Sequence, residues 1–201
     1  MIALVDYGIG NHRSVLNAMD AVGEPALLVA DPAEVVAAER VLLPGVGAFR
    51  DAIGALRERG LAQAVRDAAA AGRPVLGLCL GMQLLATRSH EFGNHEGLDL
   101  VPGTVERIET EPGLRIPHVG WNDLEVRRPD AVLADLGPEP TFYFVHSYEL
   151  RPDDEAALTG VTDYGRPVTA AVSRGTVFGV QFHPEKSAAD GLTLLKSFAT
   201  C

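Results

Sequence analysis

The sequence predicts an α/β protein with a mostly parallel central sheet flanked by helices on both faces. Short apolar runs at residues 2–5, 26–30, 40–43 and 74–78 have the length and composition of buried strands. Helical patterns at residues 12–21, 51–59 and 61–71 separate these runs, an alternation typical of parallel strands joined by helices. Gly60 and Gly72 end two of the helical patterns.

Composition indicates one domain that spans residues 1–201. With 47% hydrophobic and 22% charged residues, the chain has the balance of a globular protein. Its net charge of −10 and scattered basic residues argue against nucleic acid or an anionic membrane surface as a partner. The uncharged run between Arg73 and Arg88 is 14 residues, too short to span a bilayer. No secretory signal is visible, and two cysteines fit a reducing cytoplasm.

The first strand leads into a loop, residues 6–11, that precedes a helix. Gly8 and Gly10 in this loop are compatible with a dinucleotide site, and Asp31 stands after the second strand as such a site would need. The third glycine of that motif is missing, however, and Arg13 occupies a place that requires a small residue. The sequence therefore favours a functional loop of another kind.

The third strand runs into the loop Pro44-Gly45-Val46-Gly47. Two glycines around one valine allow backbone amides to turn toward a bound oxyanion, which larger side chains would obstruct. An ordinary strand-to-helix turn is the alternative, and this loop alone does not decide between them.

Residues 73–88 are the centre of the predicted site. The segment Gly77-Leu78-Cys79-Leu80-Gly81 has the spacing of a nucleophile elbow, with cysteine in place of serine between a buried strand and the helix-forming run 82–86. Small residues two positions either side relieve crowding in a sharp turn. Cys79 would then project at a helix N-terminus, where the thiolate form is favoured. The alternative is a buried cysteine in an ordinary strand, and the motif by itself does not separate the two.

After Thr87 the pattern changes to short strands and turns, at residues 105–108 and 124–126 among others. Residues 141–148 alternate aromatic side chains as a strand does. Taken alone, His146 is interpreted as a hydrogen-bonded core histidine and Trp121 as a core residue.

Strands at residues 169–173 and 176–181 lead to a second reactive segment. Pro184 favours an extended His183, and residues i and i+2 of an extended segment point the same way, so Glu185 is expected to contact the imidazole. A carboxylate on one ring nitrogen leaves the other to face a nucleophile. Ser187 is expected to cap a last helix at residues 188–199. A solvated His-x-Glu surface pair is the alternative.

Residues 77–83 and 181–185 together resemble the class I, or triad-type, glutamine amidotransferases. Within that family, four further segments resemble the group of glutaminase subunits of imidazole glycerol phosphate synthase in histidine biosynthesis: residues 6–11, 44–47, 117–122 and 143–148. The resemblance runs from the first strand to the last helix, with no departure at a motif position. It implies a mostly parallel sheet flanked by helices, in agreement with the pattern.

The resemblance also implies roles for individual residues. Cys79 would attack the side-chain amide of glutamine, His183 would pass the proton to the departing ammonia, and Glu185 would orient His183. The backbone N–H groups of Val46 and Leu80 would stabilise the tetrahedral oxyanion. Water would then hydrolyse the thioester to glutamate, with no metal or organic cofactor. The positions that match substrate-holding residues are Gly47, Gln83, Ser147 and Tyr148.

Ammonia released into water near neutral pH would mostly become ammonium, which is not nucleophilic, so transfer to a partner is expected. The resemblance implies a (β/α)₈-barrel cyclase subunit as that partner, in a heterodimer. The residues that match the docking face are Asn11, Trp121, Asn122 and Tyr143.

Three other classes remain as alternatives. The glutaminase of anthranilate synthase shares the triad but should lack the segment His118-Val119-Gly120-Trp121-Asn122. An α/β-hydrolase would place its acid before the histidine, whereas Glu185 follows His183. A non-catalytic binding module would form no thioester with glutamine.

Overall fold

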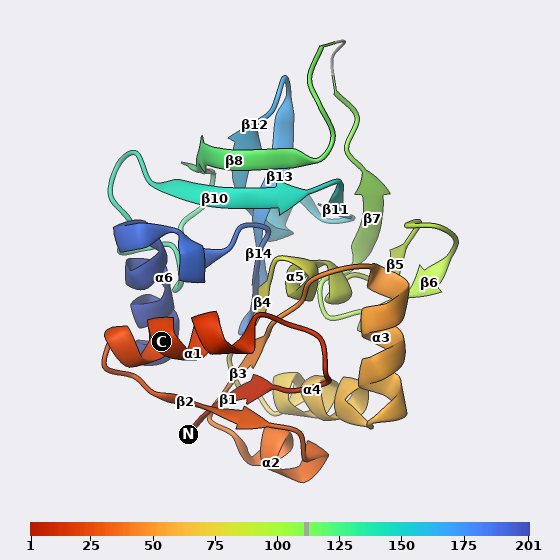
Figure 1. Cartoon of the computed structure of the whole chain (residues 1–201), viewed down its shortest axis with the longest axis vertical. Helices are drawn as coiled ribbons and strands as arrows, with labels where there is room; N and C mark the ends of the chain where they lie inside the picture. The colour runs from red at the N-terminus through yellow and green to blue at the C-terminus, as the bar shows by residue number, and fades with distance from the viewer. Residues whose placement is uncertain (111–112) are drawn as a thin grey trace.

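A computed structural model describes residues 1–110 and 113–201 of the chain and contains a central eight-stranded sheet (Figure 1). The strand order is β2-β1-β3-β4-β14-β13-β12-β9. Neighbouring strands are parallel from β2 to β14 and antiparallel from β14 to β9. The strands are β1 (Ile2–Val5), β2 (Ala26–Val29), β3 (Arg40–Leu43), β4 (Val75–Leu78), β9 (Glu125–Val126), β12 (Leu158–Asp163), β13 (Pro167–Arg174) and β14 (Val177–Val180).

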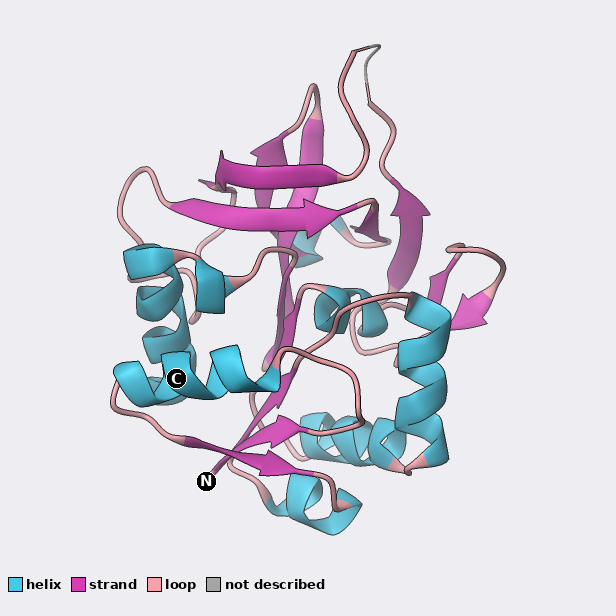
Figure 2. Cartoon of the chain, viewed as in Figure 1, coloured by secondary structure: helices cyan, strands magenta, loops and turns pink. Residues whose placement is uncertain are grey.

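Helices cover both faces of this sheet, which confirms the predicted fold class (Figure 2). Alternate strand residues face opposite sides: Val41 packs with one core cluster and Leu42 with the other. The first cluster joins the sheet to α2 (Pro32–Ala37), α3 (Phe49–Glu58), α4 (Leu61–Ala70) and α5 (Leu80–Leu84). The second joins it to α1 (His12–Ala21) and α6 (Ala188–Thr200).

Two smaller sheets lie beyond the main one. Strands β8 (His118–Asp123) and β10 (Thr141–His146) form an antiparallel ribbon that crosses the top of the view in Figure 1. The second small sheet has the order β11-β7-β5-β6. Its strands are β5 (Arg88–Ser89), β6 (His95–Glu96), β7 (Gly103–Arg107) and β11 (Tyr148–Pro152). Within the described residues there are also two 3₁₀ turns, η1 (Glu155–Ala157) and η2 (Pro184–Lys186).

The predicted boundaries are accurate for β1, β3 and α1 and shift by one or two residues for β2, β14, α3, α4 and α6. Larger differences lie after Thr87. The predicted strand 141–148 is two strands, because β10 pairs with β8 whereas β11 pairs with β7. Ser147 is the break between them.

Other elements were not predicted. Helix α2 is one of them, although its start has two ordinary sequence signals. Asp31 caps the helix by accepting a hydrogen bond from the Ala33 N–H at 2.8 Å, and Pro32 is its first residue. Strand β12 was missed because Gly160 and a register irregularity interrupt its pattern, although the strand lies inside the sheet between β9 and β13. No helix in the described residues is long and apolar enough to cross a membrane.

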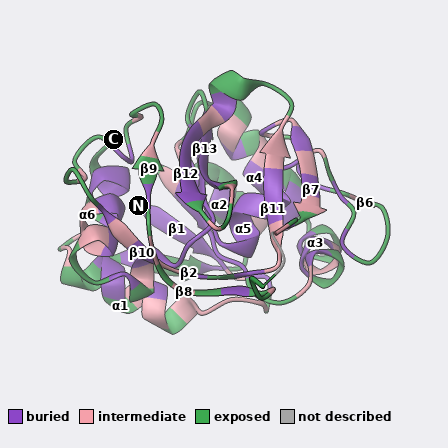
Figure 3. Ribbon diagram, turned by 90° about the horizontal axis from the view of Figure 1, so that it is seen from above, coloured by how far each residue is buried: buried purple, intermediate pink, exposed green. Residues whose placement is uncertain are grey.

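The parallel half of the sheet positions the site. Strands β3, β4 and β14 are neighbours, and in the register Leu43 lies beside Gly77 while Leu78 lies beside Val180. Their carboxyl ends therefore meet at one edge, where ligands bind in open α/β sheets. The central strands are buried, and the loops around them are more exposed (Figure 3).

Candidate active site

Cys79 occupies a strained turn directly after β4. Its backbone φ and ψ are 53° and −111°, a region that residues other than glycine rarely adopt. The Cys79 N–H donates to the Val180 carbonyl at 2.8 Å, which ties the turn to β14. The helix that follows begins at Leu80 and ends at Leu84, earlier than the run 82–86 in the sequence indicates. The side chain is buried, with 7% of the residue exposed.

The glycines of the elbow have steric reasons to be glycine. A Cβ atom on Gly81 would lie 1.9 Å from the Leu43 carbonyl oxygen, and one on Gly77 would lie 2.6 Å from the Gly81 carbonyl oxygen. Either side chain would force backbone atoms apart. The strained, glycine-flanked turn that the motif predicts is therefore present around Cys79.

His183 and Glu185 form a buried pair after β14. The His183 Nδ1–H donates to Glu185 Oε1 at 2.9 Å, and the side chains are only 4% and 2% exposed. Glu185 is not on an extended segment as predicted, because residues 184–186 form the 3₁₀ turn η2. His183 itself is extended, and the turn brings Glu185 back to the ring.

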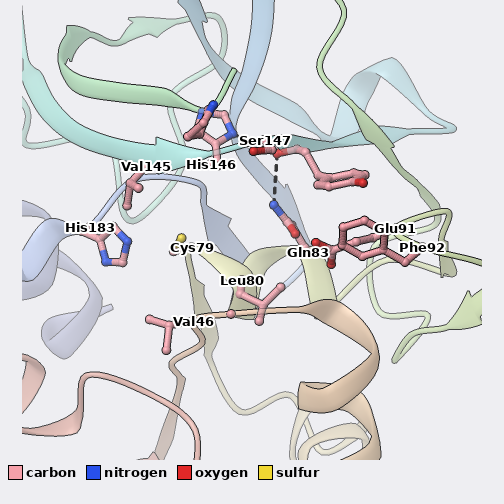
Figure 4. Close-up of a pocket in the computed structure, with 13 residues that line it drawn as sticks. Val46, Cys79, Leu80, Gln83, Glu91, Phe92, Val145, His146, Ser147 and His183 are labelled. Carbon is pink, nitrogen blue, oxygen red and sulfur yellow. Dashed lines mark hydrogen bonds between the residues drawn. The ribbon is translucent and has the colours of Figure 1, made fainter. Parts of the chain in front are cut away.

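The electrostatics of His183 favour its charged form. Burial, the largest influence, lowers the pKa, but hydrogen bonds to Cys79 and Glu185 and the charges of both outweigh it and raise the pKa from 6.5 to about 9. In Figure 4 the His183 ring faces the sulfur of Cys79. An imidazolium beside the sulfur is an environment in which cysteine reacts as a thiolate.

Ser187 does not cap α6 with its side chain as predicted, as far as the described residues show. Its hydroxyl instead donates to the His183 carbonyl oxygen at 2.5 Å and accepts from the Tyr143 N–H at 3.0 Å. The His183 N–H also donates to the Tyr143 carbonyl oxygen at 2.9 Å. These bonds fasten the segment carrying His183 to β10, which explains why the hydroxyl is not available to the helix.

The predicted oxyanion loop lies beside the elbow. Val46 and Leu80 both line the pocket that contains Cys79. The buried Tyr7 donates its hydroxyl to the Pro44 carbonyl oxygen at 2.7 Å and so anchors the first peptide of the loop. Burial raises the pKa of Tyr7, and the charge of Cys79 raises it further, so the hydroxyl remains a donor. A Cβ on Gly45 would lie 2.7 Å from the Gly81 N atom.

The pocket has a volume of about 390 Å³ (Figure 4). Cys79 and His183 line it, whereas Glu185 contacts His183 from behind. Gln83 Nε2 donates to the Tyr148 carbonyl oxygen at 3.1 Å and to Gln181 Oε1 at 2.9 Å. The four residues predicted to hold substrate all line the pocket: Gly47, Gln83, Ser147 and Tyr148.

Sequence reasoning missed part of the pocket wall: Glu91, Phe92, Pro117, Val145 and His146. Glu91 adds a carboxylate, and its Oε2 accepts from the Phe49 N–H at 2.6 Å, at the start of α3. A lone acid in a region of short strands carries no local signal, and its hydrogen-bond partner at Phe49 is 42 residues away in the sequence. No three His, Cys, Asp or Glu side chains gather as metal ligands would within residues 1–110 and 113–201.

The predicted docking residues lie on two parts of the structure, the β8–β10 ribbon and the start of α1. Trp121 and Tyr143 are register partners on the β8–β10 ribbon, with ring centroids 6.3 Å apart. Trp121 is 55% exposed, so the core interpretation of this residue was wrong. Asn122 donates through Nδ2 to the Asp163 carbonyl oxygen at 2.8 Å. Asn11 lies on a separate element, at the start of α1.

The comparisons with known proteins agree with this arrangement. A family model described as glutamine amidotransferase class-I matches residues 3–200. The chain belongs to the class I glutamine amidotransferase family. The chain is 48% identical over 197 residues to imidazole glycerol phosphate synthase subunit HisH of Moorella thermoacetica. That alignment covers 98% of this chain and 93% of that protein. The chain is 49% identical to the protein of the same name from Lacticaseibacillus casei, with 98% and 94% covered.

Several solved structures share the fold. One described as a glutamine amidotransferase superposes with a TM-score of 0.78 at 22% identity and covers 100% of both chains. PurLQS from Thermotoga maritima gives a TM-score of 0.74 at 21% identity, with 99% of this chain and 97% of that chain covered. At these identities the likeness concerns the fold alone. The family resemblance drawn from the motifs is confirmed by the family model and the HisH relatives.

Proposed function

We propose that this chain hydrolyses glutamine to glutamate and ammonia through a thioester on Cys79, and that a (β/α)₈-barrel cyclase receives the ammonia to make imidazole glycerol phosphate in histidine biosynthesis. The observation that carries the proposal is the buried His183–Glu185 pair, which meets a strained Cys79 on the wall of an open pocket. Membership in the class I family and full-length similarity to HisH proteins support it.

In the first half of the reaction, the Cys79 thiolate adds to the side-chain amide carbon of glutamine. The His183 imidazolium protonates the amide nitrogen, the C–N bond breaks, and ammonia leaves while the thioester remains. Glu185 holds the Nδ1–H, so the other ring nitrogen faces the reacting atoms. The raised pKa of His183, about 9, keeps the ring charged at neutral pH, as the proton donor must be.

In the second half, neutral His183 takes a proton from water, whose oxygen adds to the thioester carbon. The C–S bond breaks, the product leaves as the γ-carboxylic acid and gives its proton to water to become glutamate, and the thiolate–imidazolium pair is restored. Both tetrahedral intermediates carry a negative oxygen. We assign the Val46 and Leu80 N–H groups to that oxygen, because both residues line the pocket beside Cys79.

Substrate binding is assigned to the far side of the pocket. Gln83 donates both amide hydrogens to Tyr148 and Gln181, which leaves its Oε1 to accept a hydrogen bond from a ligand. Glu91 adds a negative charge on the same side. An acceptor and a carboxylate fit the α-ammonium group of glutamine. Gly47 and Ser147 complete the wall where the substrate carboxylate and chain would lie.

The ammonia acceptor is proposed to dock over the exposed ribbon that carries Trp121 and Tyr143, with Asn11 and Asn122 at the same interface. Exposed apolar side chains next to a pocket mouth are common at interfaces between proteins. A heterodimer in the cytoplasm would keep ammonia from becoming ammonium before it reacts. We further propose that the partner with bound nucleotide activates hydrolysis by favouring the loop state in which the Val46 N–H points into the pocket.

Glutamate release tests both parts of the proposal. It should be slow for the chain alone and fastest with the cyclase and its nucleotide substrate, because a missing oxyanion donor typically costs about 10²–10³ in kcat. Equal kcat for the chain alone, the complex and the complex with nucleotide would rule out the switch. Activation by anthranilate synthase subunits in place of the cyclase would instead assign the chain to another amidotransferase.

A further inference from the structure

Two histidines that the proposed mechanism does not use form a hydrogen-bonded pair at the wall of the pocket, where His146 is one of the lining residues and His118 lies next to it. His118 and His146 are cross-strand partners on β8 and β10, and both are buried. His118 Nδ1 and His146 Nε2 are 3.0 Å apart. His146 Nδ1 lies 2.9 Å from the Tyr148 carbonyl oxygen. On the other side, Asn122 Nδ2 lies 3.3 Å from His118 Nε2.

The donor and acceptor in each of these hydrogen bonds can be assigned by starting from the Tyr148 carbonyl. The Tyr148 carbonyl can only accept, so His146 Nδ1 carries a hydrogen and donates to it. In a neutral ring, His146 Nε2 then accepts from the Nδ1–H of His118. His118 Nε2 in turn accepts from the amide hydrogen of Asn122. Each ring nitrogen therefore has one role, and both rings are Nδ1–H tautomers.

The surroundings of the pair favour neutral rings. His118 stacks between Phe144 and Tyr164, with ring centroids 4.9 Å and 4.1 Å away. Burial lowers the pKa of His118 to about 4. Burial also lowers the pKa of His146 to about 4, despite its bond to the Tyr148 carbonyl. A proton added to His146 Nε2 would oppose the Nδ1–H of His118, so the neutral rings that burial favours also fit the assigned bond directions.

His146 is connected to the substrate side of the pocket through the Tyr148 carbonyl. The Tyr148 carbonyl oxygen that accepts from His146 also accepts from Gln83 Nε2 at 3.1 Å. The second amide hydrogen of Gln83 goes to Gln181 Oε1. With both hydrogens committed, Gln83 presents Oε1, and no protein donor reaches that atom within the described residues. Moving the Tyr148 carbonyl would release Gln83 to rotate.

We infer that His118 and His146 are positioning residues for substrate binding: as Nδ1–H tautomers they hold the Tyr148 carbonyl, which in turn orients the Gln83 amide toward glutamine. The inference rests on the proposed function, since it takes glutamine as the ligand. It also assigns the pair an effect on KM rather than on kcat, because neither ring is hydrogen-bonded to the reacting groups Cys79 and His183. The alternative is that the histidines only stabilise the β8–β10 ribbon.

The tautomers are tested first, by ¹⁵N NMR of the imidazole nitrogens in the chain labelled at histidine, with His118→Gln and His146→Gln for assignment. At neutral pH, protonated Nδ1 and unprotonated Nε2 are expected for both rings. An Nε2–H tautomer at either position would break the chain of bonds and overturn the inference. This measurement requires no enzymatic activity, so its outcome does not depend on whether the proposed function is correct.

Steady-state kinetics of the complex with the cyclase and its nucleotide then test the role. His146→Gln places an amide near the Nε2 position and loses the donor to Tyr148, whereas His146→Asn keeps a donor near the Nδ1 position. KM for glutamine should rise about tenfold in the first variant and little in the second, as loss of one hydrogen bond of about 1.4 kcal/mol predicts, with kcat nearly unchanged.

Val132→Ala is the matched control, because Val132 is buried in the same core cluster as Phe144 and no hydrogen bond joins its side chain to the pair. It should lower the melting temperature without raising KM. Equal KM for wild type and folded His146→Gln would overturn the inference, and so would KM values that follow stability alone across all three variants. An inactive wild-type complex would contradict the proposed function instead.

Discussion

Replacement of Glu185 by glutamine tests the electrostatic core of the site. Glu185 Oε1 accepts from His183 Nδ1–H at 2.9 Å, and its Oε2 is buried without a partner in the described residues. Glutamine has the same shape but no charge. If its oxygen faces Nδ1–H, its NH₂ group occupies the position of Oε2, buried and unsatisfied. If its NH₂ group faces Nδ1, the ring is driven to the other tautomer.

The magnitude follows from these two orientations. A hydrogen bond to a charged group stabilises by about 1.5–3 kcal/mol and a neutral one by about 0.5–1.5 kcal/mol, so the first orientation loses about 1–2 kcal/mol, or roughly 5- to 30-fold in kcat. The buried NH₂ group costs about 1–3 kcal/mol more and favours the second orientation. A wrong tautomer lowers kcat by about 10⁴ in a serine triad. We therefore expect kcat for Glu185→Gln to fall by about 10²–10³.

The assay is glutamate release by the complex at saturating glutamine, with thermal unfolding to show that the variant is folded. Glu106→Gln is a matched control, because Glu106 Oε1 lies 2.7 Å from His90 Nδ1 in a far more exposed pair outside the pocket. The control should leave kcat unchanged. An unchanged kcat in folded Glu185→Gln would remove Glu185 from the reaction and refute the reasoning.

Three further predictions concern the same pocket. Cys79→Ala should abolish hydrolysis yet leave the fold and partner docking intact; retained hydrolysis would make Cys79 structural. Tyr7→Phe removes the donor to the Pro44 carbonyl and should lower kcat about 2- to 10-fold, the effect of one neutral hydrogen bond, whereas an unchanged kcat would show that the loop needs no such anchor. Because the pKa of His183 is raised to about 9, its imidazolium predominates at neutral pH and is lost as pH rises through 9. The value of kcat/KM should accordingly fall as pH rises through about 9, with half of it lost near that pH, and a decline near pH 7 would contradict the assigned proton donor.

One variant suggested by the glycine-rich loop is not a clean test of the proposed switch. Gly45→Ala would restrict rotation of the Gly45–Val46 peptide, but its Cβ would also lie 2.7 Å from the Gly81 backbone N atom. Backbone atoms of the elbow would have to move. A loss of activity in this variant could then come from a displaced Cys79, so the comparison with and without partner and nucleotide is the better test.

The parts of the site that local sterics determine were predictable from sequence. The need for glycine at Gly77 comes from the Gly81 carbonyl four residues later, and the elbow spacing records that local contact. The need at Gly81 comes from the Leu43 carbonyl on the neighbouring strand, which the spacing of the motif does not show. The parallel strands β3 and β4 carry continuous apolar runs because both faces of the sheet are buried. From such runs the fold class followed directly.

Where long-range partners compete, the sequence was a poorer guide. Serine is a common helix-capping residue, but the hydroxyl of Ser187 is hydrogen-bonded to the Tyr143 N–H and the His183 carbonyl instead. Glu91 belongs to the pocket only because α3 begins beside it. The two interpretations of core residues had opposite outcomes: His146 is buried and hydrogen-bonded as expected, whereas Trp121 lies exposed on the ribbon.

The central claim is a covalent thioester between glutamine and Cys79. The complex with the cyclase and nucleotide should be mixed with glutamine, quenched in acid during turnover, digested and examined by mass spectrometry. We predict a glutamyl adduct on the peptide that contains Cys79, absent from Cys79→Ala and lost when glutamine is exhausted. Turnover without an adduct on that peptide, or with an adduct on Cys201 instead, would contradict the account.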